Sequence, residues 1–232
     1  MQLPPRIRRD AGVNHLLADL QAEDRSFLAS AIRTEHPLPT HVLSSRTASA
    51  ADIWFPNDGD VALSVTDNEG RTVQVGIVGA EGCIGLEHMF HDMLPMADAW
   101  VQIAGEMSVI SVAQLRAATE ARPAIQVALA RFLFSLAAQS LQTIACNRLH
   151  SLEARCCRWL LMVLDRTGDD HLPLTQESLA TMLGSGRPRI NGLLAALERD
   201  GLVRRYRGLI RLVSRAGLEA RACECYRQLS HR

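Results

Sequence analysis

The sequence predicts an α+β fold with an N-terminal antiparallel β-roll, a long helix and a C-terminal winged helix-turn-helix. Three patterns predict it: a two-residue apolar alternation within 53–112, an unbroken helical pattern over 123–150, and two short helical patterns followed by a β-hairpin pattern within 175–213. We therefore expect a roll with flanking helices over 1–122, the long helix, and a helix-turn-helix domain with a C-terminal helix over 151–232.

Composition sets the class of protein. The chain has 232 residues, 47% of them hydrophobic and 22% charged, which is ordinary globular composition and excludes collagen-like or broadly disordered chains. The charges balance at 25 basic against 25 acidic, and every basic residue is Arg. Residues 1–150 carry 11 Arg and 16 acidic residues, whereas 151–232 carry 14 and 9. A basic C-terminal third indicates a module that binds a polyanion.

The N-terminus and the apolar stretches indicate the compartment. Residues 1–10 lack the apolar core of a signal peptide, and polar residues interrupt the most apolar stretch, 125–145, at Arg131, Gln139 and Gln142. We expect no membrane span, no export and a cytoplasmic location, where the six cysteines would be reduced thiols.

The N-terminal section begins with helical spacing and then changes to strand spacing. Residues 14–33 predict two short amphipathic helices with a break near 21–24. A hairpin is predicted around the turn 67–70, and residues 100–112 predict a further strand pair. Glycines at three-residue intervals over 76–85 indicate turns between short strands.

The predicted long helix begins at Pro123, which suits a first helical turn, and would extend about 40 Å to His150. The helix has an apolar stripe that consists of Leu129, Leu133, Leu136 and Ile144, with small Ala137 and Ser140 between them. This stripe could pack on the roll, on a twin helix or on both. The length favours a dimerisation helix over a core helix of one domain.

The third section carries the most specific pattern. Thr175 is a natural N-cap for a short helix, residues 184–186 form a turn, and Pro188 is tolerated in the first turn of a second helix. The second helix has an apolar face at Ile190, Leu193, Leu194 and Leu197. Such a second helix can enter a DNA major groove.

A two-stranded wing is predicted after these helices, over 202–206 and 209–213. The region carries seven Arg, at 187, 189, 199, 204, 205, 207 and 211, opposed by Glu198 and Asp200. A solvated basic face is the alternative, but helical period, turn and wing together favour DNA binding.

At this point the chain resembles the Crp/Fnr family of bacterial transcription regulators over nearly its whole length. The matching segments are IWFPNDGDVALSV with GRTVQVGIVGAEGCIG, NRLHSLEARCCRWLL, LTQESLATMLGSGRPRINGLLAALERDGLV and SRAGLEARACECY. The resemblance implies a cyclic-nucleotide-binding-like jelly roll and a homodimer whose recognition helices read a near-palindromic site on double-stranded DNA, with half-sites about one helical turn apart. It also allows RNA polymerase and an unidentified small-molecule effector as partners.

The resemblance assigns roles in the recognition helix. Arg187 falls where the family has an Arg that reaches a guanine edge, whereas Pro188 and Gly192 replace polar residues that help to read bases in the cyclic-AMP branch. The preferred half-site should therefore differ from that branch. The remaining DNA-binding candidates are Gln176, Arg189 and Asn191 for phosphate or secondary base contacts, with ordinary solvent exposure as the alternative, and Arg204, Arg205 and Arg207 for phosphate attraction.

The expected effector pocket departs from the cyclic-nucleotide branch. That branch has a Glu directly after the Ile-Gly turn and an Arg-Ser or Arg-Thr pair before a later strand. Here the corresponding positions are Leu86, with Glu87 beside it, and Ala97 and Asp98; Ser140 completes the candidate pocket. A phosphodiester would meet Asp98 with no cation to neutralise it, so we expect no cyclic AMP binding in the usual mode.

The cysteines and histidines offer a competing class of function. No Cys precedes Cys83, which argues against the N-terminal iron-sulfur site of the family's anaerobic branch. A metal- or redox-dependent protein using Cys83, His88 and His91, or the C-terminal Cys223 and Cys225, is the alternative, but the spacing matches no strong motif. The sequence also lacks a nucleophile-base pair or phosphate-cradling loop. We expect a regulator without a cofactor, not an enzyme.

Overall fold

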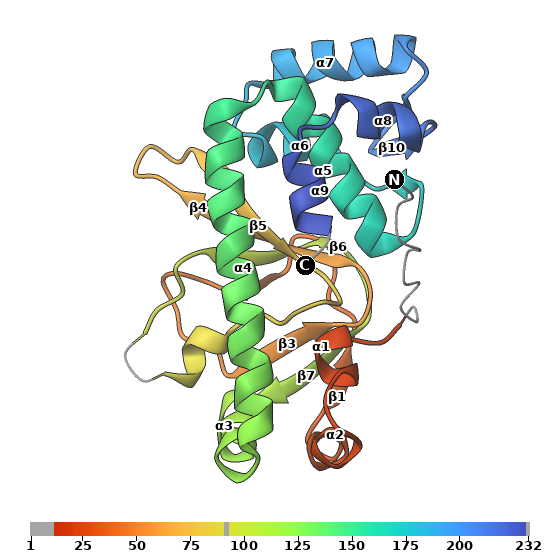
Figure 1. Ribbon diagram of the computed structural model, residues 1–232. Helices are drawn as coiled ribbons and strands as arrows, with labels where there is room; N and C mark the ends of the chain where they lie inside the picture. The colour runs from red at the N-terminus through yellow and green to blue at the C-terminus, as the bar shows by residue number, and fades with distance from the viewer. Residues whose placement is uncertain (1–11, 91–92, 231–232) are drawn as a thin grey trace.

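The computed structural model describes residues 12–90 and 93–230, with the roll at one end, the helix-turn-helix domain at the other, and helix α4 running along both (Figure 1). The predicted fold class is confirmed. Two short N-terminal helices, α1 (His15–Ala18) and α2 (Ala22–Ala29), precede the roll, as their spacing predicted. Asn14 caps α1 through the amide of Leu17 and donates from Nδ2 to the carbonyls of Pro56 and Gly82, both at 2.8 Å, which fixes α1 on the roll.

The roll consists of two antiparallel sheets, with strand orders β1-β7-β3 and β2-β6-β4-β5. Its strands are β1 (Arg33–Glu35), β2 (Val42–Ser44), β3 (Asp52–Pro56), β4 (Asp60–Thr66), β5 (Thr72–Val78), β6 (Asp98–Ile103) and β7 (Met107–Ser111). The predicted hairpin is β4–β5. The predicted pairing within 100–112 is wrong: both strands form, but β6 pairs with β2 and β4 while β7 pairs with β1 and β3.

Two helical segments of the roll were not predicted. The 3₁₀ helix η1 (Leu86–Met89) follows Gly85, whose φ of 94° lies in the left-handed region. Helix α3 (Val112–Ala121) begins with a capping box between Ser111 and Gln114. That Ser-x-x-Gln signal stands in the sequence at the end of the predicted strands, but no helix is predicted directly after residue 112.

Helix α4 (Pro123–Leu149) confirms the predicted long helix, but its apolar residues occupy two faces. Ile125, Leu129 and Phe132 are buried against the roll, whereas Leu133 is 40% and Ile144 is 63% exposed. Of the predicted stripe, Leu129 packs on the roll, while Leu133 and Ile144 stand on the exposed side. By length and composition alone α4 would suit a membrane span, yet one face packs on β5 and α3.

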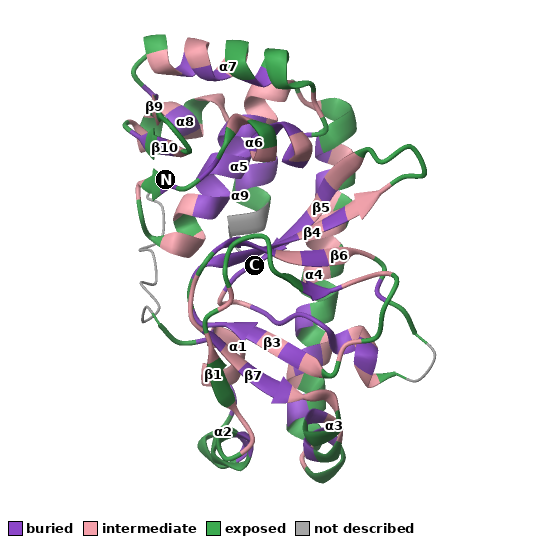
Figure 2. Ribbon diagram, turned by 180° about the vertical axis from the view of Figure 1, so that it is seen from behind, coloured by how far each residue is buried: buried purple, intermediate pink, exposed green. Residues whose placement is uncertain are grey.

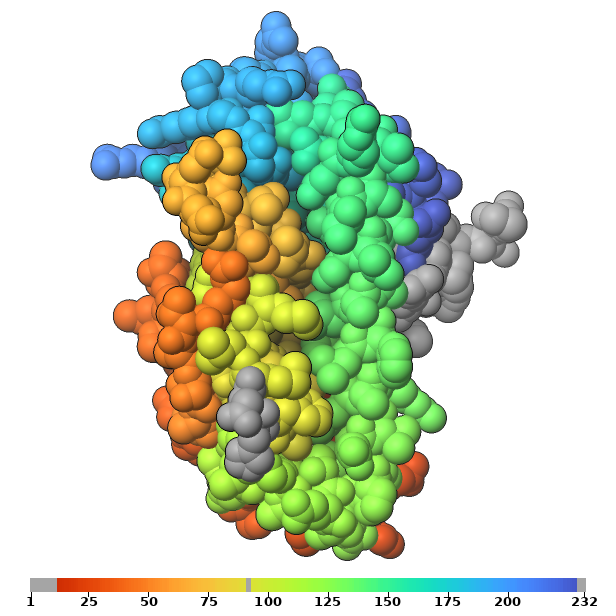
Figure 3. Space-filling view, turned by 90° about the vertical axis from the view of Figure 1, so that its left-hand side faces the viewer, coloured from red at the N-terminus to blue at the C-terminus, as the bar shows by residue number. Residues whose placement is uncertain are grey.

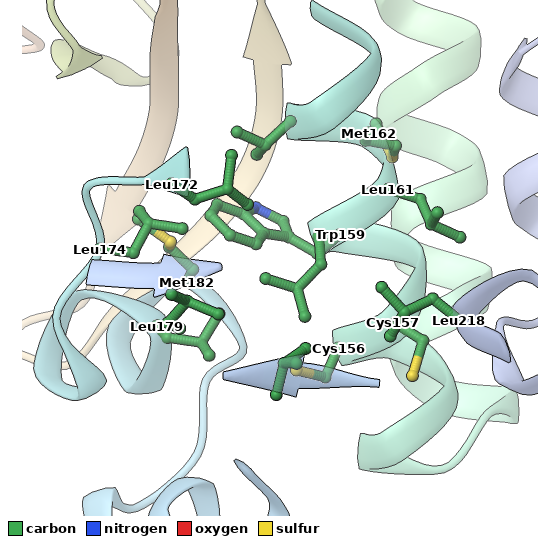
Figure 4. Close-up of a cluster of buried hydrophobic side chains, with 14 of the residues drawn as sticks. Cys156, Cys157, Trp159, Leu161, Met162, Leu172, Leu174, Leu179, Met182 and Leu218 are labelled. Atoms are coloured by element: carbon green, nitrogen blue, oxygen red, sulfur yellow. The ribbon is translucent and has the colours of Figure 1, made fainter. Parts of the chain in front are cut away.

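The helix-turn-helix domain contains α5 (Leu152–Thr167), β8 (His171–Leu172), α6 (Gln176–Met182), α7 (Arg187–Arg199), β9 (Val203–Tyr206), β10 (Leu209–Leu212), α8 (Arg215–Arg221) and α9 (Cys225–Ser230). The wing has a third strand, because β8 pairs with β10. Trp159 lies at the centre of this core, with Leu172, Leu174 and Leu179 around it and both Cys156 and Cys157 buried (Figure 4).

Polar contacts join the roll to this domain and to α4, one of them buried and the others partly buried. The indole Nε1 of Trp159 donates to Oε1 of Gln74 in β5 at 3.0 Å, and Arg166 binds Glu81 at 2.7 Å. Gln139 of α4 accepts from the backbone N–H of Ile77 at 2.8 Å. Buried polar groups that lose a partner cost about 1–3 kcal/mol, so these contacts fix one arrangement of the two domains.

The close approach of α4 to the loop before η1 requires a glycine at position 82. A Cβ there would lie 2.0 Å from Cε2 of the buried Phe132. We expect Gly82→Ala to lower the free energy of unfolding by about 1–3 kcal/mol, measured by urea titration. The matched control is Gly192→Ala in α7, where no heavy atom lies within 4 Å and the change should stabilise the helix by up to about 1 kcal/mol. Equal stabilities for the two variants would contradict the packing.

Asp60 in β4 is fully buried beside Arg166 and Glu81, and burial raises its pKa from 3.8 to about 7. The folded protein therefore keeps a proton that the unfolded chain releases above pH 3.8. Stability should fall as pH rises through this window to about 7, by at most about 1.4 kcal/mol per pH unit. Asp60→Asn should remove this dependence, as measured by urea unfolding at pH 5 and pH 8. An unchanged difference between the two pH values would contradict the assignment.

Candidate nucleic-acid interface

Helix α7 is held on the domain by its apolar face and by the turn before it. Ile190, Leu194 and Leu197 are fully buried, and Leu193 is half-buried. The predicted N-cap is confirmed: the hydroxyl of Thr175 accepts from the amide of Ser178 at 3.0 Å and opens α6. Gly184, with φ of 57°, then turns the chain into α7.

The opposite face of α7 is exposed and basic. Arg187, Pro188, Arg189 and Asn191 are all exposed, as Figure 2 shows for the outer side of this helix. Within the described part of the chain, neither Arg187 nor Arg189 has a carboxylate within 4.0 Å. Gly192 leaves the backbone bare, since an added Cβ there would meet no heavy atom within 4 Å. The surface therefore offers free guanidinium groups and a close backbone approach at the helix N-terminus, where the dipole is positive.

The wing supplies further positive charge, but its Arg residues are not equivalent. Arg204 and Arg207 are exposed and have no ion pair among the residues that the structure covers. Arg205 is engaged: its Nε lies 2.7 Å from Oε2 of Glu198, and Nη1 donates to Oδ1 of Asn191 at 3.0 Å. These contacts from Arg205 hold the pKa of Glu198 below its usual value.

Each of the two acidic residues near the Arg cluster already forms an ion pair, one with an Arg outside the cluster and one with an Arg inside it. Asp200 binds Arg221 at 2.7 Å, and Glu198 binds Arg205. Arg211 forms an ion pair with Asp170 at 3.3 Å, so its charge is already matched by a carboxylate. Gln176, at the start of α6, is half-buried. The cations that remain exposed on the helix and the wing, with no ion pair among the described residues, are Arg187, Arg189, Arg199, Arg204 and Arg207.

The residues of the expected effector pocket are buried, half-buried or already hydrogen-bonded within the protein. Leu86 is buried, and Ala97 and Ser140 are half-buried. Oε1 of Glu87 accepts from the hydroxyl of Ser44 at 3.3 Å.

The expectation that Asp98 lacks a neutralising cation is wrong. Its carboxylate accepts from the backbone and Nε of Arg46, at 2.9 and 3.3 Å, and from the hydroxyl of Ser45 at 3.2 Å. Arg46 was missed because it lies 52 residues away in the sequence. The positive charge of Arg46 is therefore already matched by the carboxylate of Asp98.

The proposed Cys83, His88 and His91 group is not assembled by the described residues. Cys83 is buried and burial raises its pKa well above the usual value, which makes it an unreactive thiol. His88 is buried and hydrogen bonds through Nε2 to Ser44 at 3.0 Å. His91 lies outside the described residues. The donor atoms that do meet are those of Cys146, His150, Cys223 and Cys225. The four-residue spacing of Cys146 and His150 on a helix was the signal available in the sequence.

Comparison with known proteins agrees with this arrangement. A Crp-like helix-turn-helix domain model matches residues 154–221. The HTH-type transcriptional regulator Cmr of Mycobacterium tuberculosis is 30% identical over 210 residues, which are 88% of this chain and 82% of that protein.

Solved structures show the same fold. A Crp/Fnr-family regulator from Eubacterium rectale has a TM-score of 0.70 at 17% identity, covering 89% of this chain and 96% of its own. A CRP/FNR-family regulator from Thermus thermophilus has a TM-score of 0.67 at 22% identity, covering 82% and 98%. With the identity to Cmr over most of both chains, the chain belongs to the Crp/Fnr family of transcriptional regulators.

Proposed function

We propose that this regulator binds a near-palindromic site on double-stranded DNA as a homodimer, with one α7 in each of two successive major grooves. The observation that carries the proposal is the exposed Arg187 and Arg189, which have no ion pair within the described residues, at the N-terminus of a helix whose other face is buried through Ile190, Leu194 and Leu197. A helix with this division of faces can enter a groove without disturbing its own domain.

The second copy is the proposed occupant of the outer face of α4. Large side chains stand exposed there at seven-residue spacing, Val127, Phe134 and Leu141, with Ala130, Ala137 and Ile144 three residues after each. A seven-residue repeat of this kind suits two helices that supercoil around each other. Helix α4 lies uncovered along the molecule in Figure 3, and a two-fold axis would place the same stripe of the partner on its exposed face.

Base reading is assigned to Arg187, which can form two hydrogen bonds with a guanine edge. Arg205 has a different role, because it is bound to Glu198 and holds the side-chain oxygen of Asn191. We assign phosphate attraction to Arg204 and Arg207, and we assign Arg205 the positioning of Asn191 on α7. The effector is not cyclic AMP in the usual mode, because Arg46 and Asp98 neutralise each other at the position where a phosphate would need a free cation.

In-vitro selection from random duplexes tests the proposal directly. We expect the full-length, purified protein to enrich a two-fold symmetric sequence at moderate salt. Failure to enrich any sequence, with weak salt-sensitive binding only, would contradict sequence-specific reading by the ligand-free protein.

Substitutions on the helix and on the wing should have separable effects. Arg187→Ala should relax the preference at one base pair in each half-site, with a loss of about 1–3 kcal/mol of discrimination. Arg204→Ala should weaken binding to all sequences alike and reduce the slope of log affinity against log salt by about one unit per phosphate contact. Arg25→Ala, in α2 at the far end of the molecule, is the control and should change neither quantity (Figure 1). An unaltered base preference in Arg187→Ala would remove that residue from base reading.

A charge within the outer face of α4 should separate the copies. Leu141 is 68% exposed, so Leu141→Glu leaves the fold of one chain intact while burying carboxylates between two helices. We expect a monomer in sedimentation and a large loss of affinity for the symmetric site. Ser135→Glu, exposed on α4 outside the stripe, is the control and should remain a dimer. A dimeric Leu141→Glu protein would place the interface elsewhere.

A further inference from the structure

Four potential metal ligands from two distant parts of the chain meet beside the end of α4. Cys146 lies in the last turn of α4 and His150 is its C-cap, while Cys223 lies between α8 and α9 and Cys225 begins α9, with Glu224 between the two cysteines. Sγ of Cys146 lies 3.5 Å from Sγ of Cys223, and Sγ of Cys225 lies 3.5 Å from Nδ1 of His150. All four donor atoms lie within 4.8 Å of one another.

These distances suit a single tetrahedral ion. Zinc binds Cys sulfur at about 2.3 Å and His nitrogen at about 2.0–2.1 Å, so tetrahedral ligand atoms are separated by roughly 3.5–3.8 Å. Three thiolates and one imidazole fill the coordination sphere and leave no open position, as in structural zinc sites. We propose that Cys146, His150, Cys223 and Cys225 form a structural zinc site that joins helix α4 to the C-terminal segment of the DNA-binding domain.

The surrounding groups match those of a zinc site. Oε1 of Glu224 lies 3.1 Å from Nε2 of His150, so this carboxylate accepts from one imidazole nitrogen and leaves Nδ1 to face the sulfurs. This is the carboxylate–histidine arrangement that orients metal-bound imidazoles. Nε2 of Gln142 donates to Sγ of Cys225 at 3.0 Å, a contact that stabilises a thiolate.

A buried cation beside the four ligands also favours an anionic centre at this site. Arg158 is buried, 5% exposed, and neither its Nε nor its Nη1 has a hydrogen-bond partner among the described residues. A zinc ion with three thiolates carries a net charge of −1, which would compensate this buried cation.

The competing use of these residues is a disulfide between Cys146 and Cys223. That bond would use two of the four donors and would leave the Glu224–His150 pair and the Gln142 contact without a purpose. A thiol set in a cytoplasmic protein is more often a metal site than a disulfide. The inference is independent of DNA reading, because the ligands lie on α4 and the C-terminal segment and not on α7.

Metal content of the full-length protein tests the site. Protein purified with reductant and then given one equivalent of zinc should retain one ion per chain after desalting, and Co²⁺ in its place should show intense visible bands typical of a tetrahedral thiolate site. Metal-free protein with free thiols, or a Cys146–Cys223 disulfide that persists in reductant, would overturn the proposal.

Variants locate the ion. Cys223→Ser should lose the bound zinc, whereas Cys83→Ser, a buried cysteine of the roll, should retain it. Because Cys223→Ser could unfold the segment, Glu224→Gln provides a second readout on an exposed side chain. It should weaken zinc affinity about 10–100-fold in a chelator competition, while Glu120→Gln, exposed at the end of α3, should not. Wild-type zinc affinity in Cys223→Ser or in Glu224→Gln would overturn the assignment.

Discussion

Helix α4 carries apolar side chains on two opposite faces, and the rest of the structure depends on how each face is covered. Ile125, Leu129 and Phe132 pack into the roll, which fixes α4 along the whole molecule. The other face presents Phe134 and Leu141 to solvent. An exposed apolar stripe of this kind suits contact with another protein surface.

The roll and the helix-turn-helix domain meet through a shared core. Ile77 and Ile103 of the roll belong to the same buried cluster as Trp159 of α5. The buried Trp159–Gln74 hydrogen bond and the Arg166–Glu81 ion pair tie this cluster together. Since unpaired buried polar groups are costly, this joint resists small rotations. These contacts hold α7 in one orientation relative to α4.

Ion pairs within the domain engage some of the arginines around the exposed face of α7. Internal carboxylates neutralise Arg205 and Arg211, which leaves Arg187, Arg189, Arg199, Arg204 and Arg207 as exposed cations without an ion pair among the described residues. Phosphate can pair only with arginines that have no internal ion pair. These ion pairs therefore limit the positions at which a polyanion can bind. The proposed zinc site contributes at the other side of the domain, where it would fix the chain after α8 to the end of α4.

The sequence by itself determined the local elements: the hairpin β4–β5, the length of α4, the caps of α6, and the exposed and buried faces of α7. These follow from periodicities of 2 and 3.6 residues and from side chains that cap their own helix. Only the tertiary structure decided that β6 and β7 belong to different sheets, that Arg46 neutralises Asp98, and that Cys146 meets Cys223. The latter two contacts join residues 52 and 77 positions apart, so their geometry depends on how whole sheets and helices pack and not on any local pattern.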